Sequence, residues 1–421
     1  MKTPDLIITA DTILTCHSNN GYKAGVKQMN DVGLLKDGFI AVKDGKIIDV
    51  DKIANLNKKY KKAKKTIHCK NKVVMPGFVD SHTHPIFAGT RVNEFQERLK
   101  GLTYEEIHAK GGGIQATVNA TRKAEFSELI ENAKFYIRAM IKHGTTSIEA
   151  KSGYGLTVED EIKSLKAIKK LKEELPVDIV PTFLGAHSIP AEYKKNRAEY
   201  VNLIINKMLP WIKKDKLADN VDVFCEEGAF TLLETKKILD RAKKLGFKLK
   251  IHSDEFKSLG GTALIAKLKG VSADHLMNIS DKDINALAKS KVAAVILPGT
   301  TFFLNKDKYA PARKMIDKGV AVALATDFNA GSCQTMSLQM IISLACLKMK
   351  MTPEEAINAA TINGAYALSK SRKLGSITKG KQADFCVLSI SDYRHLPYYF
   401  GTNLVECVIK RGKIIYNMAC F

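Results

Sequence analysis

The sequence predicts an α/β protein: a (β/α)₈ TIM-like barrel with a small β-sandwich domain formed by both termini. Between residues 73 and 372, eight apolar runs alternate with amphipathic helical patterns, and this alternation indicates a parallel sheet. Both ends consist instead of short strand-like runs and turns. A length of 421 residues suits a barrel with an attached domain. We therefore expect 1–72 and 373–421 to form the sandwich and 73–372 to form the barrel.

Short strands separated by turns predict the terminal domain. At the N-terminal end, Asp44-Gly45 is flanked by two strand-like runs, and this dipeptide favours a tight hairpin turn. The strands that we expect here lie at 6–10, 38–42, 46–50, 383–388, 405–409 and 414–416.

The barrel is predicted by apolar, often β-branched runs and by the helical patterns between them. The expected strands are 73–79, 145–150, 177–184, 221–225, 249–252, 271–275, 292–297 and 320–325. The clearest helices are expected over 125–142, 158–175, 232–245 and 353–368. The active site of such a barrel lies at the C-terminal ends of its strands.

Composition narrows the class of protein. A hydrophobic content of 45% is ordinary for a folded chain, and no apolar run approaches the roughly 20 residues of a membrane helix. The net charge of +22 comes from lysines spread along the chain without a nucleic-acid motif, so we expect a small anionic substrate and neither nucleic acid nor membrane as partner. The start of the chain lacks the features of a signal peptide, so we expect a cytoplasmic protein.

The eight cysteines argue against thiolate chemistry. None of them forms a Cys-x-x-Cys pair, so a thiolate zinc site is not expected. In a cytoplasmic chain of this length, scattered cysteines are typical of reduced thiols.

Two histidines follow the first predicted barrel strand. His82 and His84 are two residues apart, so both side chains project in the same direction from an extended chain. Neutral imidazole is a common ligand of zinc and iron. Such a pair arises by chance in many chains, however, and its meaning depends on the other strands.

Polar residues follow most of the other strands at the same end of the barrel. We propose three histidines and one aspartate as ligands of a single zinc or iron ion, because this donor set suits a borderline divalent metal. These ligands are His82, His84, His252 and Asp327. Such an ion lowers the pKa of water towards roughly 7, and Asp327 could also take the water's proton. The reaction class that follows is hydrolytic attack on a carbonyl or amidine carbon.

Several segments carry a family resemblance. The segment 76–84, the later His252 and His275, and the segment 325–327 resemble the amidohydrolase superfamily. Within it, the chain resembles the imidazolonepropionase family in segments that span most of its length: 111–114, 149–156, 183–187, 223–228, 252–256, 272–276, 309–313, 326–329 and 393–398. The resemblance implies hydrolysis of 4-imidazolone-5-propanoate to N-formimino-L-glutamate in histidine degradation, and it suggests a homodimer.

The resemblance also implies the residues that hold the substrate and act on it. Physical chemistry suggests that Arg91 pairs with the propionate carboxylate and that His275 polarises the attacked carbonyl. Glu255 could bind a ring N–H or move a proton from the water, and both roles stay open. The implied substrate-binding residues are Arg91, Tyr154, His187, Glu255, Asn329, Gly331 and Ser332, and the catalytic ones are Asp327, His275 and Glu255.

Three alternatives accompany this interpretation. One is a deaminase that acts on a cyclic amidine with the same metal set. Another is a basic binding protein that keeps the barrel without catalysis. The third is a carboxylated Lys151 bridging two metals; because Lys151 follows the second strand, whereas related binuclear enzymes take this lysine from the fourth, we expect one metal and a structural Lys151.

Overall fold

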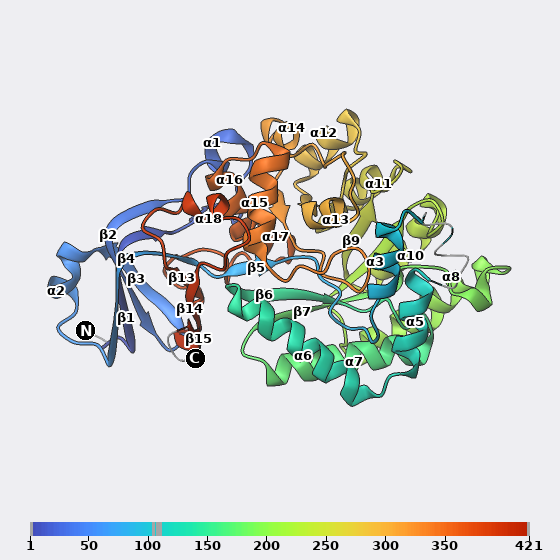
Figure 1. Ribbon diagram of the computed structural model, residues 1–421, viewed down its shortest axis with the longest axis horizontal. Helices are drawn as coiled ribbons and strands as arrows, with labels where there is room; N and C mark the ends of the chain where they lie inside the picture. Colours follow the sequence, from blue (N-terminus) through green and yellow to red (C-terminus); the bar gives the residue numbers. More distant parts are fainter. Residues whose placement is uncertain (1–2, 103–105, 107–111, 419–421) are drawn as a thin grey trace.

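The computed structural model describes residues 3–102, 106 and 112–418. It contains two sheets: the terminal sheet lies at one end of the molecule, the barrel sheet lies next to it, and both chain termini lie at the end with the terminal sheet (Figure 1). The terminal sheet has the strand order β15-β14-β13-β4-β1-β2-β3, and the barrel sheet has the order β12-β11-β10-β9-β8-β7-β6-β5. The predicted fold class is confirmed.

The strands of the terminal sheet are β1 (Leu6–Leu14), β2 (Leu34–Lys43), β3 (Lys46–Lys52), β4 (Lys65–Pro76), β13 (Phe385–Leu388), β14 (Val405–Lys410) and β15 (Lys413–Asn417). The barrel strands are β5 (Phe78–Asp80), β6 (Thr145–Lys151), β7 (Asp178–Ala186), β8 (Asn220–Cys225), β9 (Lys248–Ser253), β10 (Ser272–His275), β11 (Ala293–Ile296) and β12 (Val322–Leu324).

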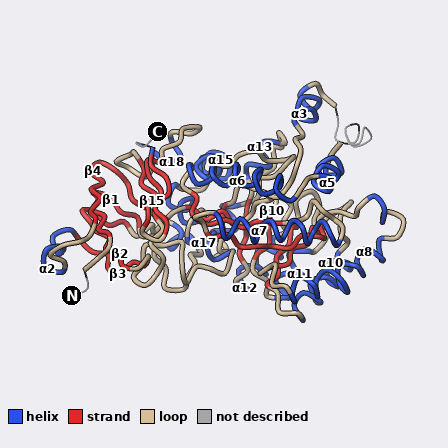
Figure 2. Tube along the Cα trace, turned by 90° about the horizontal axis from the view of Figure 1, so that it is seen from below, coloured by secondary structure: helices blue, strands red, loops and turns tan. Residues whose placement is uncertain are grey.

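Helices surround the barrel strands (Figure 2). The described helices in the first half of the chain are α1 (Gly25–Met29), α2 (Leu56–Lys59), α3 (Val92–Leu99), α5 (Ile114–Lys123), α6 (Phe126–Lys142), α7 (Val158–Glu174), α8 (Arg197–Leu203), α9 (Leu209–Lys214) and α10 (Leu232–Lys244). The second half contains α11 (Gly261–Leu268), α12 (Asp281–Ser290), α13 (Pro298–Phe303), α14 (Ala312–Asp317), α15 (Leu338–Met349), α16 (Pro353–Ala359), α17 (Ile362–Ala367) and α18 (His395–Tyr398). No helix in the described ranges is both long and apolar enough to cross a bilayer.

The segments after β5 and β12 close the barrel. The Asp327 amide donates to the carbonyl of His82 (3.0 Å), and the His84 amide donates to the carbonyl of Phe328 (2.8 Å). Below them, the Asp80 carboxylate accepts hydrogen bonds from the amide and the hydroxyl of Thr326 (3.0 and 2.6 Å). Barrel closure therefore brings the residues after the first strand against those after the last.

The terminal sheet folds over an aliphatic core. Ile8, Ile40, Phe385 and Ile409 are wholly buried members of this core. Lys46, at the start of the edge strand β3, forms an antiparallel bridge with Gln382 just before β13. The sheet thus returns on itself as a small sandwich does.

One strand differs from its prediction. We expected a single barrel strand over 73–79, but β4 stays in the terminal sheet to Pro76, which pairs with Phe385, and β5 begins at Phe78. The chain changes sheet at Gly77, where a Cβ atom would lie 2.2 Å from the Thr146 side chain. Only glycine permits this close approach.

One helix also differs. The pattern over 353–368 predicted a single helix, whereas the structure has α16 and α17 with a break at Thr361. The Thr361 backbone leaves the helical region (φ −125°, ψ −93°), while its hydroxyl donates to the Ile357 carbonyl (2.7 Å). The new direction places Gly364 of α17 against the Val79 backbone of β5.

Candidate metal centre and active site

The first two histidines and the aspartate of the last strand meet at the barrel mouth. His82, His84 and Asp327 are 0–2% exposed. The two histidine Nε2 atoms are 3.2 Å apart, and each is 3.4 Å from Asp327 Oδ1. Ligands at the bond lengths of a tetrahedral zinc ion are about 3.3 Å from one another. These three atoms therefore have the spacing of donors to one divalent ion.

Carboxylates orient the rings of His82 and His252. The Nδ1–H of His82 donates to Asp274 Oδ2 (2.6 Å), and that of His252 donates to Asp222 Oδ1 (3.1 Å). Each contact leaves Nε2 as the nitrogen with a free lone pair. His252 Nε2 is buried and has no hydrogen-bond partner among the described residues, so the donors fit a divalent cation.

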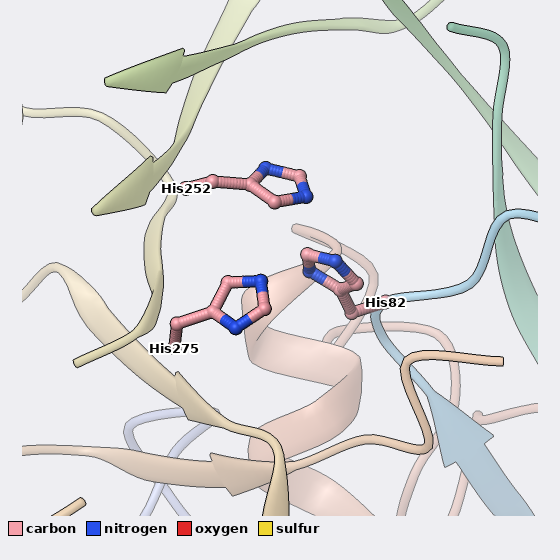
Figure 3. A group of neighbouring side chains, drawn as sticks. All are labelled: His82, His252 and His275. Atoms are coloured by element: carbon pink, nitrogen blue, oxygen red, sulfur yellow. The ribbon is translucent and has the colours of Figure 1, made fainter. Parts of the chain in front are cut away.

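His275 joins the cluster from the end of β10. The side chains of His82, His252 and His275 point into a common space (Figure 3), and their donor nitrogens are close enough together to hold an ion as well. The His275 backbone has a φ of +80°, a strained conformation for a residue with a side chain. Burial lowers the pKa of His275 well below its usual value, so the ring is neutral.

The two acidic groups of the site have opposite titration behaviour. Burial would raise the pKa of Asp327, but its contacts with the surrounding histidines, His82 and His84 first, outweigh this effect and hold the pKa well below its usual range. Burial, and then the charges of Asp327 and Glu226, raise the pKa of Glu255 well above its usual value. Glu255 lies 3.6 Å from His275 Nδ1. The arrangement thus pairs an ionised carboxylate with a carboxyl that favours its protonated form.

Arg91 and Gly331 lie against each other beside this cluster. The Arg91 Nε donates to Glu94 Oε2 (2.9 Å), and a Cβ atom at Gly331 would lie 1.9 Å from Arg91 Nη1. Glycine at 331 therefore makes room for the guanidinium. Arg91 is close enough to Tyr154 to oppose the rise that burial causes in the tyrosine's pKa.

Tyr154 and His187 lie beside the histidines of the candidate metal centre. The His187 ring stacks on the His84 ring with centroids 5.3 Å apart, and the Tyr154 ring is 5.3 Å from His187 and 6.2 Å from His84. His187 Nδ1 donates to the Gly153 carbonyl (3.0 Å), which leaves Nε2 for other contacts.

Asn329 organises the loop that carries Gly331 and Ser332. Its Oδ1 accepts from both of their backbone amides at 2.8 Å, and its Nδ2 donates to the Asp327 carbonyl (2.7 Å) and to the Ser332 hydroxyl (2.8 Å). In this structure the Asn329 amide therefore shapes the loop between Asp327 and Gly331.

Sequence reasoning missed three residues that contact the site, and it gave Asp274 no role. Asp222 and Asp274 orient histidines, Lys250 lies beneath them, and the Thr300 hydroxyl donates to Asp327 Oδ2. Lys250 could have been found from its spacing, because it is two residues before His252 and so shares its face of the strand. Thr300 lies on α13 and carries no comparable signal.

The chain is similar to known proteins over most of its length. A model of the Amidohydrolase family matches residues 73–415. The chain is 47% identical over 405 residues to an imidazolonepropionase of Alkaliphilus oremlandii, with 96% of each chain covered. It is 47% identical over 419 residues to one of Clostridium tetani, with 99% of each covered.

Solved structures of low sequence identity share the fold. An adenosine deaminase from Xanthomonas campestris with bound zinc matches with a TM-score of 0.73 at 18% identity, covering 98% of this chain and 93% of that one. E. coli guanine deaminase matches with a TM-score of 0.72 at 15% identity, covering 98% of each chain. Together with its near full-length relatives, the matched family model shows that the chain belongs to the amidohydrolase family and, within it, to the imidazolonepropionases.

Proposed function

We propose that the protein hydrolyses the cyclic amide bond of 4-imidazolone-5-propanoate to N-formimino-L-glutamate, a step of histidine degradation. The observation that carries this proposal is the position of Arg91 against Gly331, in the loop that follows Asp327, with the Tyr154 ring 6.2 Å from that of His84. A guanidinium binds a carboxylate through paired hydrogen bonds, and the substrate has a carboxylate on the side chain of its reacting ring. The near full-length imidazolonepropionase relatives support the same substrate.

For the cofactor we propose one Zn²⁺ or iron ion per chain, held by His82, His84, His252 and Asp327. Such an ion would supply a hydroxide nucleophile at neutral pH. A second acidic group, formed by His82, Glu149 and Asp274, is also compact enough for an ion. There, however, the Lys250 ammonium lies 2.7 Å from Glu149 Oε2 and 3.5 Å from Asp274 Oδ2. Since positive charge is already present, we expect one ion.

Residues around the ion would bind the substrate and transfer protons. Arg91 would hold the propionate, with Tyr154 and His187 as further donors. The water oxygen bonds to the carbonyl carbon, the ring C–N bond breaks, and the nitrogen gains a proton. Asp327 is ionised and can take the water's proton.

His275 and Glu255 would act on the attacked amide. A neutral His275 can donate one N–H to the developing oxyanion. The pKa of Glu255 is raised, so this side chain can hold a proton near neutral pH and pass it on. In its ionised form it could instead accept a hydrogen bond from a ring N–H of the substrate. Both roles of Glu255 remain part of the proposal. Asn329, Gly331 and Ser332 would form the wall of the pocket beside Arg91.

We also propose that the enzyme is a cytoplasmic homodimer whose partner is a small anionic molecule, with neither nucleic acid nor membrane involved. Light scattering of the purified protein would report twice the chain mass, and salt-sensitive binding to DNA would contradict the proposal.

The decisive test is turnover of 4-imidazolone-5-propanoate by protein loaded with Zn²⁺ or Fe²⁺, with cytosine and guanine as control substrates. We expect N-formimino-L-glutamate as product and no release of ammonia from either base. Turnover of a base alone would overturn the substrate assignment, and metal analysis with two ions per chain would overturn the single-ion site.

A further inference from the structure

Five charged side chains form a wholly buried group beneath the candidate metal centre, and none of them is a proposed metal ligand. They come from β6, β8, β9 and β10, and each has 0% of its surface exposed. Burying a charge is costly unless it is paired and hydrogen-bonded. The members of this group are Glu149, Lys151, Asp222, Lys250 and Asp274.

The five groups alternate in sign along one line of contacts. Lys151 Nζ lies 2.6 Å from Asp222 Oδ2 and 2.8 Å from Glu149 Oε2. Lys250 Nζ lies 2.7 Å from the same Glu149 oxygen and 3.5 Å from Asp274 Oδ2. Lys250 also donates to the Ser81 carbonyl (2.9 Å).

Each end of the line reaches a different histidine. Asp222 accepts from Nδ1 of His252, and Asp274 accepts from Nδ1 of His82. A carboxylate on the far nitrogen fixes the tautomer and the ring orientation of a metal-binding histidine. Two histidines from different strands are therefore held by one continuous set of charge pairs.

We infer that Lys151 and Lys250 are positioning residues of the metal centre: by holding Asp222 and Asp274, they keep the Nε2 atoms of His252 and His82 directed at one ion. The inference rests on the proposed metal site. Without Lys151, Asp222 keeps its hydrogen bond with His252; without Lys250, Asp274 keeps its hydrogen bond with His82 and a 4.0 Å contact with Lys151 Nζ. Each aspartate is then held by fewer charge pairs, so the ring that it orients is less firmly directed.

Lys410 provides a matched control. It is 5% exposed on its side chain and, like the two barrel lysines, lies between two carboxylates: Asp178 Oδ2 (2.7 Å) and Asp384 Oδ2 (2.8 Å). This group lies where β14 meets β7 and the segment before β13, away from the histidines. Removing its charge tests the general cost of leaving a buried carboxylate, that of Asp384, without its ammonium partner, since Asp178 keeps Arg411.

The experiment measures the Zn²⁺ dissociation constant of the full-length protein by competition with a chelator, together with the unfolding temperature. We expect Lys151→Met and Lys250→Met to weaken Zn²⁺ binding by about 10- to 100-fold, the usual loss when the groups behind a ligand are removed. Lys410→Met should lower the unfolding temperature and leave the dissociation constant unchanged. In the double variant of Lys151 and Lys250, the loss should be smaller than the product of the single losses, because both act on one chain of contacts.

A third variant covers the case in which the lysine variants do not fold. Glu149→Gln keeps the volume of the central residue and weakens both of its ammonium contacts, and it should also weaken Zn²⁺ binding. If wild-type protein binds one Zn²⁺ and the folded variants bind it as tightly as Lys410→Met does, the inference is wrong. If the wild type binds no Zn²⁺ or iron, the proposed function fails first, and the inference fails with it.

Discussion

Two buried lysines, Lys151 of the barrel and Lys381 of the terminal domain, have different surroundings. In the barrel, burial would lower the pKa of Lys151, but Asp222 and Glu149 outweigh it and raise this pKa. In the terminal domain, the acceptors of Lys381 among the described residues are neutral: the Ser376 hydroxyl at 2.6 Å and the Leu374 carbonyl at 3.5 Å. Burial accordingly lowers the pKa of Lys381 to about 8.

The ammonium group of Lys151 is paired with carboxylates beneath the candidate metal centre, whereas burial of the Lys381 ammonium group lowers the stability of the fold. The barrel buries its ammonium groups among carboxylates that also orient histidines, whereas the core of the terminal sheet is aliphatic. Changes in the barrel should therefore alter metal binding, and changes in the terminal domain should alter stability alone.

The largest effect should come from removing a proposed ligand. We expect His252→Ala to lose the metal and to lower turnover by more than roughly 100-fold, because a ligand matters more than the groups behind it. Elemental analysis and a turnover assay measure both. The control is His68→Ala, an exposed histidine of β4 in the terminal sheet, which should keep both. Equal metal content in the two variants would refute His252 as a ligand.

The next change removes a core side chain of the terminal sheet and leaves the proposed metal ligands in place. Ile8 is wholly buried, so Ile8→Ala should lower the free energy of unfolding by about 2–5 kcal/mol through the lost contacts and the cavity. Zn²⁺ affinity of the folded protein should not change. Urea unfolding and chelator competition give the two quantities, and a weakened affinity would show that the two domains are coupled.

A smaller effect is expected where Arg91 is proposed to bind the carboxylate of the substrate. In Gly331→Ala the new methyl group would displace the Arg91 guanidinium, so the KM for imidazolone propionate should rise by roughly 10- to 100-fold, the worth of a charged hydrogen bond. Arg91→Ala should raise KM in the same way, and both variants should keep the metal. An unchanged KM in both would remove Arg91 from the substrate site.

A pH-dependent effect is expected at Lys381. Below about pH 8 this lysine is protonated in both the folded and the unfolded state, so the cost of burying its charge is present in full. Between about pH 8 and 10.5 the folded state releases the proton while the unfolded state keeps it, so stability should rise by at most about 1.4 kcal/mol per pH unit. Lys381→Met should lack this rise. Parallel stability curves for the two proteins, measured by urea unfolding, would contradict the expectation.

The barrel was predictable because its signals are local. Apolar runs alternate with helical patterns, and each barrel strand after the first was expected within a few residues of its observed bounds. The errors arose where packing overrides local pattern: Gly77 moves the chain between sheets, and Thr361 divides a continuous helical pattern in two. Neither break is visible without the neighbouring element.

Sequence alone determined that His82 and His84 share a direction and that Asp327 lies at the same end of the barrel, because strand geometry and barrel topology place them there. Only the tertiary structure decided which groups stand behind them. Asp222 and Asp274 lie on β8 and β10, on either side of His252, and Asp274 is its register partner. Their pairing with Lys151 and Lys250 depends on side chains from four strands that meet in one buried layer. An unpaired charge is costly there because water is excluded.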